Sequence, residues 1–162
     1  MAQADISSTT GAPFYSGSWE DIRTICRSLN IGEGKIAKIG QETVNFFQES
    51  ADREIDAQLT NLYITPLIQF NQYMPDGSTK ALYPGEIVGL ARYFAAGLLM
   101  ASEFQGVAEN AQEQSEKYLA VAKKSLYDIT RFNHRLQGQI YISTLRMMPP
   151  TWQPPVPPEY NG

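Results

Sequence analysis

The sequence predicts a mainly α protein, a helical bundle of about four helices with a loop or short hairpin excursion, one C-terminal strand and an extended proline-rich tail. Apolar residues recur at helical spacing in four stretches of the chain. A Pro75-Asp76-Gly77 turn signal separates the second stretch from the third, and six prolines crowd residues 149–158. These three observations indicate a small helical bundle with extensions.

The chain length suits one compact domain with extensions at both ends. Domains of about 100–150 residues are the commonest, and the chain has 162 residues. We expect a mobile N-terminal arm over residues 1–17, because this region is small, polar and rich in Gly, Ser and Thr. The helical domain is expected over residues 18–137, with the excursion at 64–83, and the extended strand and tail over 138–162.

The first two helices are predicted from their caps and apolar stripes. Ser18 is typical of an N-cap with Asp21 three residues later, and a short amphipathic helix follows that places Cys26 on its apolar face. We interpret this cysteine as a buried structural thiol. The second helix is expected over residues 41–63, because the residue before Pro66 is pushed out of the helical region. Its stripe comprises Val44, Phe47, Ala51, Ile55, Leu59 and Leu62.

The stretch from Pro84 to Phe104 is apolar on nearly every face, and the rest of the bundle is expected to pack around it. A helix of this kind lies inside a domain or inside a bilayer. Its apolar run is shorter than the roughly 20 residues that span a membrane, and it contains Arg92, so we interpret it as a buried core helix. Gly89 and Gly97 are unfavourable inside a helix, so neighbouring helices are expected to approach closely at both.

The C-terminal third contains the last helix and then loses helical spacing. The helix is expected over residues 110–131, with acidic residues at its start and basic residues at its end. Residues 139–145 are β-branched and aromatic, which predicts one strand, and no partner strand is evident nearby. The prolines that follow predict polyproline II structure. Eight residues are predicted to form the core: Phe47, Ile55, Leu59, Leu90, Phe94, Leu98, Leu119 and Leu126.

The charge distribution argues against nucleic-acid binding by the whole chain. The net charge is −4 and the sequence pI is about 5.0. The region from Lys117 to Arg146 is nevertheless basic, with six cations and one anion. A solvated helix face is the simpler interpretation, and a contact surface is the alternative. Four of these cations are candidates for a channel or assembly surface: Lys123, Lys124, Arg131 and Arg135.

No catalytic or metal-binding pattern is evident, so we expect a protein that is not an enzyme and uses no cofactor. A Cys26/His134 dyad lacks a marked third group that would orient the histidine. Glu49, Asp52 and Asp56 could hold a cation, but their spacing on a helix is interpreted as a solvated face. One cysteine and one histidine exclude a Cys/His metal cluster, and neither a P-loop nor a dinucleotide-binding glycine pattern occurs.

The order of motifs between Ser18 and Ile129 resembles that of the head–tail connector proteins of tailed bacteriophages. The resemblance is based on the Trp19-Glu20-Asp21-Ile22 opening, the Ile55-Asp56 helix that ends before Pro66-Leu67, and the buried helix with Arg92-Tyr93. A helix ending Leu126-Tyr127-Asp128-Ile129 completes the pattern. The long excursion and the proline-rich tail depart from plainer family members.

The resemblance implies a structural virion protein without catalytic activity. Such proteins form a ring, commonly dodecameric, that binds the portal protein, contacts tail or neck proteins and lets genomic DNA pass without sequence-specific binding. They are made in the host cytoplasm and lie in the neck of the virion, with no membrane contact. A small helical adaptor whose proline-rich tail docks into a partner groove is the alternative function.

The C-terminal segment is the predicted partner-binding region. An unpaired strand can be completed by another chain, and large aromatic side chains are favoured where partners bind. Residues 139–160 are therefore expected to leave their own domain and dock on a neighbouring subunit or partner. The predicted contact residues are Ile140, Tyr141, Ile142, Trp152, Pro154, Pro155 and Tyr160.

Overall fold

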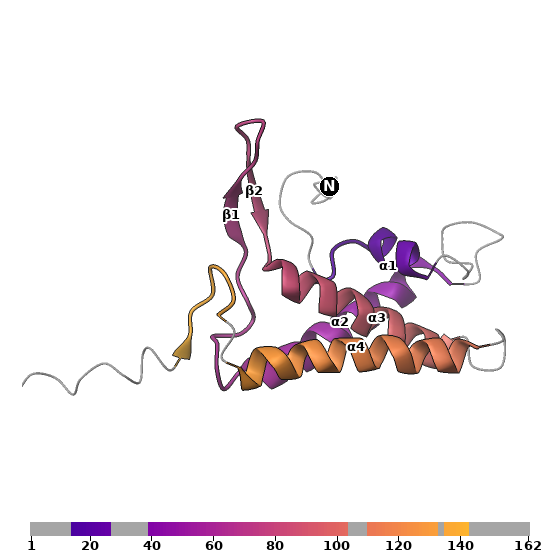
Figure 1. Ribbon diagram of the computed structural model, residues 1–162. Helices are drawn as coiled ribbons and strands as arrows, with labels where there is room; N and C mark the ends of the chain where they lie inside the picture. Colours follow the sequence, from indigo (N-terminus) through magenta and orange to yellow (C-terminus); the bar gives the residue numbers. More distant parts are fainter. Residues whose placement is uncertain (1–13, 27–38, 104–109, 133–134, 143–162) are drawn as a thin grey trace, which may run out of the picture.

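In the described part of the chain, four helices and a two-stranded antiparallel sheet form the fold, which confirms the mainly α prediction (Figure 1). The structure is a computed structural model and describes residues 14–26, 39–103, 110–132 and 135–142. The elements in chain order are α1 (Trp19–Ile25), α2 (Gln41–Leu59), β1 (Phe70–Tyr73), β2 (Thr79–Leu82), α3 (Gly85–Glu103) and α4 (Ala111–Arg131).

Helix α3 lies at the centre of the bundle, as its apolar sequence predicts. It packs most extensively against α4, then against α2, and also contacts α1. Arg92, the cation of this helix, lies at the edge of the bundle. Its guanidinium pairs with Asp21 at 3.0 Å, and its Nε donates a hydrogen bond to the Ser16 carbonyl at 2.9 Å. Among the described residues, no helix combines the length and the apolar character that crossing a membrane requires.

The apolar core divides into two clusters along the bundle. One joins α1 to the first half of α2 and the second half of α3, and the other joins the remaining halves of α2 and α3 to the end of α4. Leu98 and Leu119 are only partly buried against the first cluster. The other six predicted core residues are buried: Phe47, Ile55, Leu59, Leu90, Phe94 and Leu126.

The two glycines of α3 lie in opposite environments. At Gly97 the prediction of a close helix approach is confirmed, because an added Cβ would lie 2.7 Å from Cγ of Leu119. Because the two helices are close here, the Ser115 hydroxyl of α4 donates a 2.8 Å hydrogen bond to the Gly97 carbonyl. At Gly89 the prediction is wrong, because an added Cβ would meet nothing within 4 Å. The missing side chain opens a groove there instead.

The N-terminal segment just before α1 is packed onto the bundle, so the prediction of a mobile arm over residues 1–17 is wrong for residues 14–17. Tyr15 and Ser16 are 4% and 0% exposed. Gln48 of α2 donates hydrogen bonds to the Ser16 hydroxyl at 2.7 Å and to the Gly17 carbonyl at 3.1 Å. Buried polar groups need such partners. The sequence alone does not indicate them, because Ser16 and Gly17 are small residues that also suit an exposed segment. Residues 1–13 lie outside the described part of the chain.

Helix α2 ends four residues earlier than predicted. The backbone N–H groups of Leu62 and Tyr63 both bond to the Leu59 carbonyl, which closes the helix in a turn. Beyond the end of the helix, the Tyr63 side chain is buried in the second core cluster and is 1% exposed. The predicted N-cap at Ser18 is confirmed, and the Asp21 side chain accepts a 2.9 Å hydrogen bond from the Ser18 N–H.

Candidate functional site

The β1–β2 hairpin projects away from the four helices (Figure 1). Its strands pair in the register Phe70 with Leu82 through Tyr73 with Thr79, so the hairpin alternative for the excursion is confirmed. Most of its side chains are exposed, and the Tyr73 ring is 83% exposed. A two-stranded hairpin alone is marginally stable in water. The exposed strands are therefore candidates for contact with another chain.

The turn of the hairpin is ordered by a side chain. Oδ1 of Asp76 accepts hydrogen bonds from the Ser78 backbone N–H at 2.9 Å and from its hydroxyl at 2.6 Å. These bonds favour the carboxylate and lower the pKa of Asp76. Gly77 has a φ of +82°, a left-handed conformation that glycine adopts without strain.

The base of the hairpin is held by residues that follow α4. The amide of Gln139 donates to the Ile68 carbonyl at 2.7 Å and accepts from its N–H at 3.0 Å. One side chain thus pairs with the backbone as a neighbouring strand would. Gly138, with a φ of +72°, lies against Phe70 so closely that an added Cβ would be 2.7 Å from the Phe70 Cβ.

The predicted separation of residues 139–160 from their own domain is wrong for residues 139–142. Tyr141 forms an antiparallel bridge with Tyr63. Ile64 N–H donates to the Ile140 carbonyl at 3.1 Å, and Ile142 N–H donates to the Leu62 carbonyl at 2.7 Å. The predicted strand therefore contributes a single bridge in the described residues, and its partner is the turn after α2, which has no strand pattern of its own.

The predicted partner-binding residues divide between described and undescribed parts of the chain. Ile140 is 48% exposed, while Tyr141 and Ile142 are half-buried against the domain. The ring of Tyr141 packs edge-on against that of Tyr63, with centroids 5.3 Å apart. The remaining predicted residues lie outside the described residues: Trp152, Pro154, Pro155 and Tyr160.

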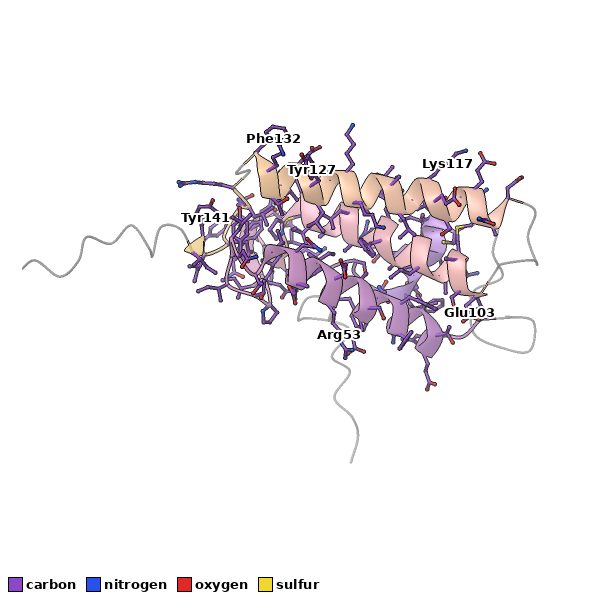
Figure 2. All side chains as sticks on the ribbon, turned by 90° about the horizontal axis from the view of Figure 1, so that it is seen from below. Arg53, Glu103, Lys117, Tyr127, Phe132 and Tyr141 are labelled. Atoms are coloured by element: carbon purple, nitrogen blue, oxygen red, sulfur yellow. The ribbon has the colours of Figure 1, made fainter. Side chains whose placement is uncertain are left out.

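A groove of about 610 Å³ lies between the first half of α3 and the second half of α4. Large apolar side chains on and beside it are exposed, including Tyr93 at 37%, Val121 at 48% and Phe132 at 70%. Figure 2 shows Phe132 and Tyr127 at the same end of the bundle as Tyr141. The groove was missed by the sequence interpretation, whose only signal for it was the glycine at position 89.

The four predicted basic residues are exposed on α4 and just beyond it. Lys124, Tyr127 and Arg131 share one face, because they are three and four residues apart. The Arg131 guanidinium lies 5.6 Å from the centroid of the Tyr127 ring. Lys123 is turned by about 100° from Lys124 but lies four residues before Tyr127, so it adjoins this face. Lys123, Lys124 and Arg131 therefore lie on one side of α4, and Arg135 lies beyond its end, 5.9 Å from the Tyr141 ring.

A polar cluster holds the N-terminal segment against α2. The Tyr15 hydroxyl donates to Oδ1 of Asp56 at 2.7 Å and accepts from the Leu67 N–H at 2.7 Å. The Tyr15 N–H donates to Oδ2 of Asp52 at 3.1 Å. Oδ1 of Asp52 is buried and accepts no hydrogen bond from any described residue. The predicted solvated face for Glu49, Asp52 and Asp56 is therefore wrong for Asp52 and Asp56, which Tyr15 covers.

Burial of this cluster predicts a pH-dependent stability. Desolvation raises the pKa of Asp52 to about 7, with the Tyr15 hydrogen bond opposing and the charges of Asp56 and Glu49 adding to the shift. Because the folded state binds more protons than the unfolded state, the free energy of unfolding falls as the pH rises from about 4 to about 7. Asp52→Asn is expected to remove this loss and to gain about 1–2 kcal/mol over wild type at pH 8, allowing for solvent screening.

Urea unfolding of both chains at pH 5 and pH 8 measures this difference. The exposed Glu54 lies on the same helix, so Glu54→Gln is the control and should follow wild type at both pH values. Equal gains or losses for Asp52→Asn at the two pH values would contradict the assigned shift.

The sequence raises two chemical alternatives, a metal site and a Cys26/His134 dyad. No group of three Asp, Glu, His or Cys side chains in that part of the chain could hold a metal ion. Cys26 is buried, and desolvation raises the pKa of its thiol to about 12, which disfavours the nucleophilic thiolate. His134, its partner in the weighed dyad, lies outside the described residues. Comparisons of the chain with protein families, curated proteins and solved structures found no match.

Proposed function

We propose that this protein is a non-enzymatic structural protein of a tailed bacteriophage, which forms a ring between the portal protein and the tail. In this proposal twelve copies lie in the neck of the virion, contact tail or neck proteins and surround the passing genomic DNA. The mainly α body with a helix-linked hairpin supports the proposal together with the motif order from Ser18 to Ile129.

The projecting hairpin is the observation that carries the proposal. Opposite residues in an antiparallel pair alternate between bonding each other and directing their backbone groups outward. The 2.8 Å bond from the Met74 N–H to the Ser78 carbonyl sets this alternation, so Asn71 and Tyr73 direct N–H and C=O groups away from β2. Such an edge is a template for pairing with another chain.

The sequence of the hairpin does not protect this edge. Its only charged residues from Phe70 to Leu82 are Asp76 and Lys80, and charges or prolines along an edge are the usual means of preventing association. A contact between the hairpin of one copy and a different surface of the next copy is heterologous. Repetition of a heterologous contact closes a ring when the rotation between copies allows it.

Asn71→Pro is expected to abolish ring formation while the helical body stays folded. Proline removes the outward N–H of β1 and leaves the bonds to β2 in place. Asn71→Ala keeps that N–H and is the matched control. Light scattering and negative-stain electron microscopy, with and without purified portal protein, measure the assembly, and far-ultraviolet circular dichroism measures the helix content.

Three outcomes of this experiment are informative. Loss of assembly in Asn71→Pro alone supports the edge contact. Full assembly of Asn71→Pro removes the hairpin edge from the proposal. A wild-type chain that stays monomeric and does not bind portal protein overturns the ring and favours the alternative, a small helical adaptor whose proline-rich tail docks into a partner groove.

A further inference from the structure

The groove between α3 and α4 has the properties of a site for an extended apolar peptide. Its lining is mainly apolar and aromatic, with carboxylates at one end. The lining includes Glu86, Gly89, Tyr93, Ser125, Asp128 and Phe132. Aromatic grooves of this kind bind proline-rich segments, because proline restricts the backbone before binding and so lowers the entropy lost on docking.

Gly89 makes the floor of this groove. A Cβ built at this position would meet nothing within 4 Å, although the residue lies in the interior of α3. Glycine is unfavourable there relative to alanine, and no neighbouring helix needs the space. Glycine at this position lowers helix propensity and leaves an open surface. In this respect Gly89 differs from Gly97, which packs tightly against Leu119.

The chain itself contains a segment of matching chemistry. Residues 149–160 hold six prolines, with Trp152 and Tyr160 near either end, and the cation Arg146 precedes them. The prolines suit the aromatic rings of the groove, and Arg146 suits the carboxylates of Glu86 and Asp128 at its end.

The last described residues before this segment lie at one end of the groove. Ile142 N–H is bound to the Leu62 carbonyl, and Tyr141 lies at the same end as Phe132 (Figure 2). Six residues separate Ile142 from Pro149 and span up to about 20 Å when extended. We propose that the groove between α3 and α4 binds the proline-rich segment 149–160 of this chain.

The segment can be supplied by the same copy or by a neighbouring one, and the groove contacts are the same in both cases. The proposal does not depend on the proposed ring. A monomeric protein whose groove holds its own segment satisfies it, and a ring whose groove is covered by another surface overturns it.

Gly89→Met is the test variant, because it fills the groove without disturbing the core. Methionine has a higher helix propensity than glycine, and the added side chain enters open space. Ala57→Met places the same side chain on an exposed position of α2 and is the matched control. Thermal unfolding of Gly89→Met is expected at or above the wild-type midpoint, and that of Ala57→Met close to it, because methionine is only slightly below alanine in helix propensity.

Fluorescence of Trp152 reports the position of the segment. In a Trp19→Phe background, Trp152 is the one remaining tryptophan of the chain. Its emission is expected at shorter wavelength, and with weaker quenching by acrylamide, than that of a free peptide of residues 147–161. Gly89→Met should shift the emission and the quenching to the values of the free peptide, and Ala57→Met should leave both unchanged.

Cross-linking locates the same contact independently. The chain carries Ser125→Cys in the groove and Val156→Cys in the segment, while the buried Cys26 is shielded from a flexible bismaleimide. Cross-linking is expected in this chain and should fall by about tenfold or more with Gly89→Met, which corresponds to about 1.4 kcal/mol of lost binding. Mixing the two single-cysteine chains gives a covalent dimer when a neighbouring copy supplies the segment.

Two results would overturn the proposal. One is a Trp152 signal and a cross-linking yield that are the same in Gly89→Met and Ala57→Met. The other is a change of self-association in Gly89→Met with no change at Trp152, which would assign the groove to the body of a second copy.

Discussion

Phe94→Ala is expected to lower the free energy of unfolding by about 3–5 kcal/mol. The Phe94 side chain lies in the central helix α3, is 5% exposed and packs in the first core cluster. Truncation loses the transfer free energy of the ring and leaves a cavity that the packed helices fill only in part. Most domains are stable by about 5–15 kcal/mol, so this one change removes a large part of the total.

Phe46→Ala is the matched control for this substitution. Phe46 lies on α2 and is 62% exposed, so its removal should change stability by about 0.5 kcal/mol or less. Urea unfolding followed by circular dichroism measures both variants. A loss below about 1 kcal/mol for Phe94→Ala would contradict the central position of α3.

Tyr63→Ala is expected to cost about 3–5 kcal/mol as well, because Tyr63 joins the C-terminal segment to the second core cluster. Its side chain is 1% exposed, and its hydroxyl oxygen accepts a 3.1 Å hydrogen bond from the buried Leu136 N–H. Its ring also supports Tyr141. The variant loses the ring, the acceptor and the support together.

Tyr63→Phe separates these contributions. It keeps the ring and leaves the Leu136 N–H without this acceptor, which should cost about 1–3 kcal/mol. Hydrogen exchange at Leu136 and Ile142 should accelerate in both variants. Tyr73→Ala, at a position that is 83% exposed, is the control, and equal losses in Tyr63→Ala and Tyr73→Ala would contradict the role of Tyr63.

The helices could be predicted from the sequence because each one carries its own signal. The stripes of α2 and α4 and the nearly uniform apolar character of α3 follow from the face that each helix buries. The turn signal Pro75-Asp76-Gly77 is local as well, and it indicated a hairpin as one of the two alternatives for the excursion, since the turn residues determine the turn. Burial of six of the eight predicted core residues follows from these periodicities.

The contacts of the segments that flank the helical domain could not be predicted in this way. Tyr15 bonds to a residue 37 positions away, and Gln139 bonds to one 71 positions away. Such contacts depend on the assembled bundle and leave no period in either segment. Both segments therefore appeared to be extensions, although their described residues, 14–17 and 138–142, pack on the domain.

The candidate groove was invisible to sequence for a related reason. Gly89 and Gly97 are the same residue in the same helix, and the sequence assigns them the same environment. Only the position of α4 distinguishes them, because Leu119 packs against Gly97 while the α4 residues near Gly89 leave space. A surface formed by two helices is a property of their packing and not of either sequence.

Ribosomal synthesis delivers Tyr63 well before the residues that complete its surroundings. Leu136, whose N–H donates a hydrogen bond to the Tyr63 hydroxyl, follows 73 residues later. At about 5–20 residues per second, this separation corresponds to about 4–15 seconds of translation. Leu59, Tyr63 and Leu67 share a cluster with Leu136, so this cluster cannot close on a shorter nascent chain. A pause in translation before residue 136 prolongs the exposure of these side chains and, with it, the period in which nascent chains can aggregate.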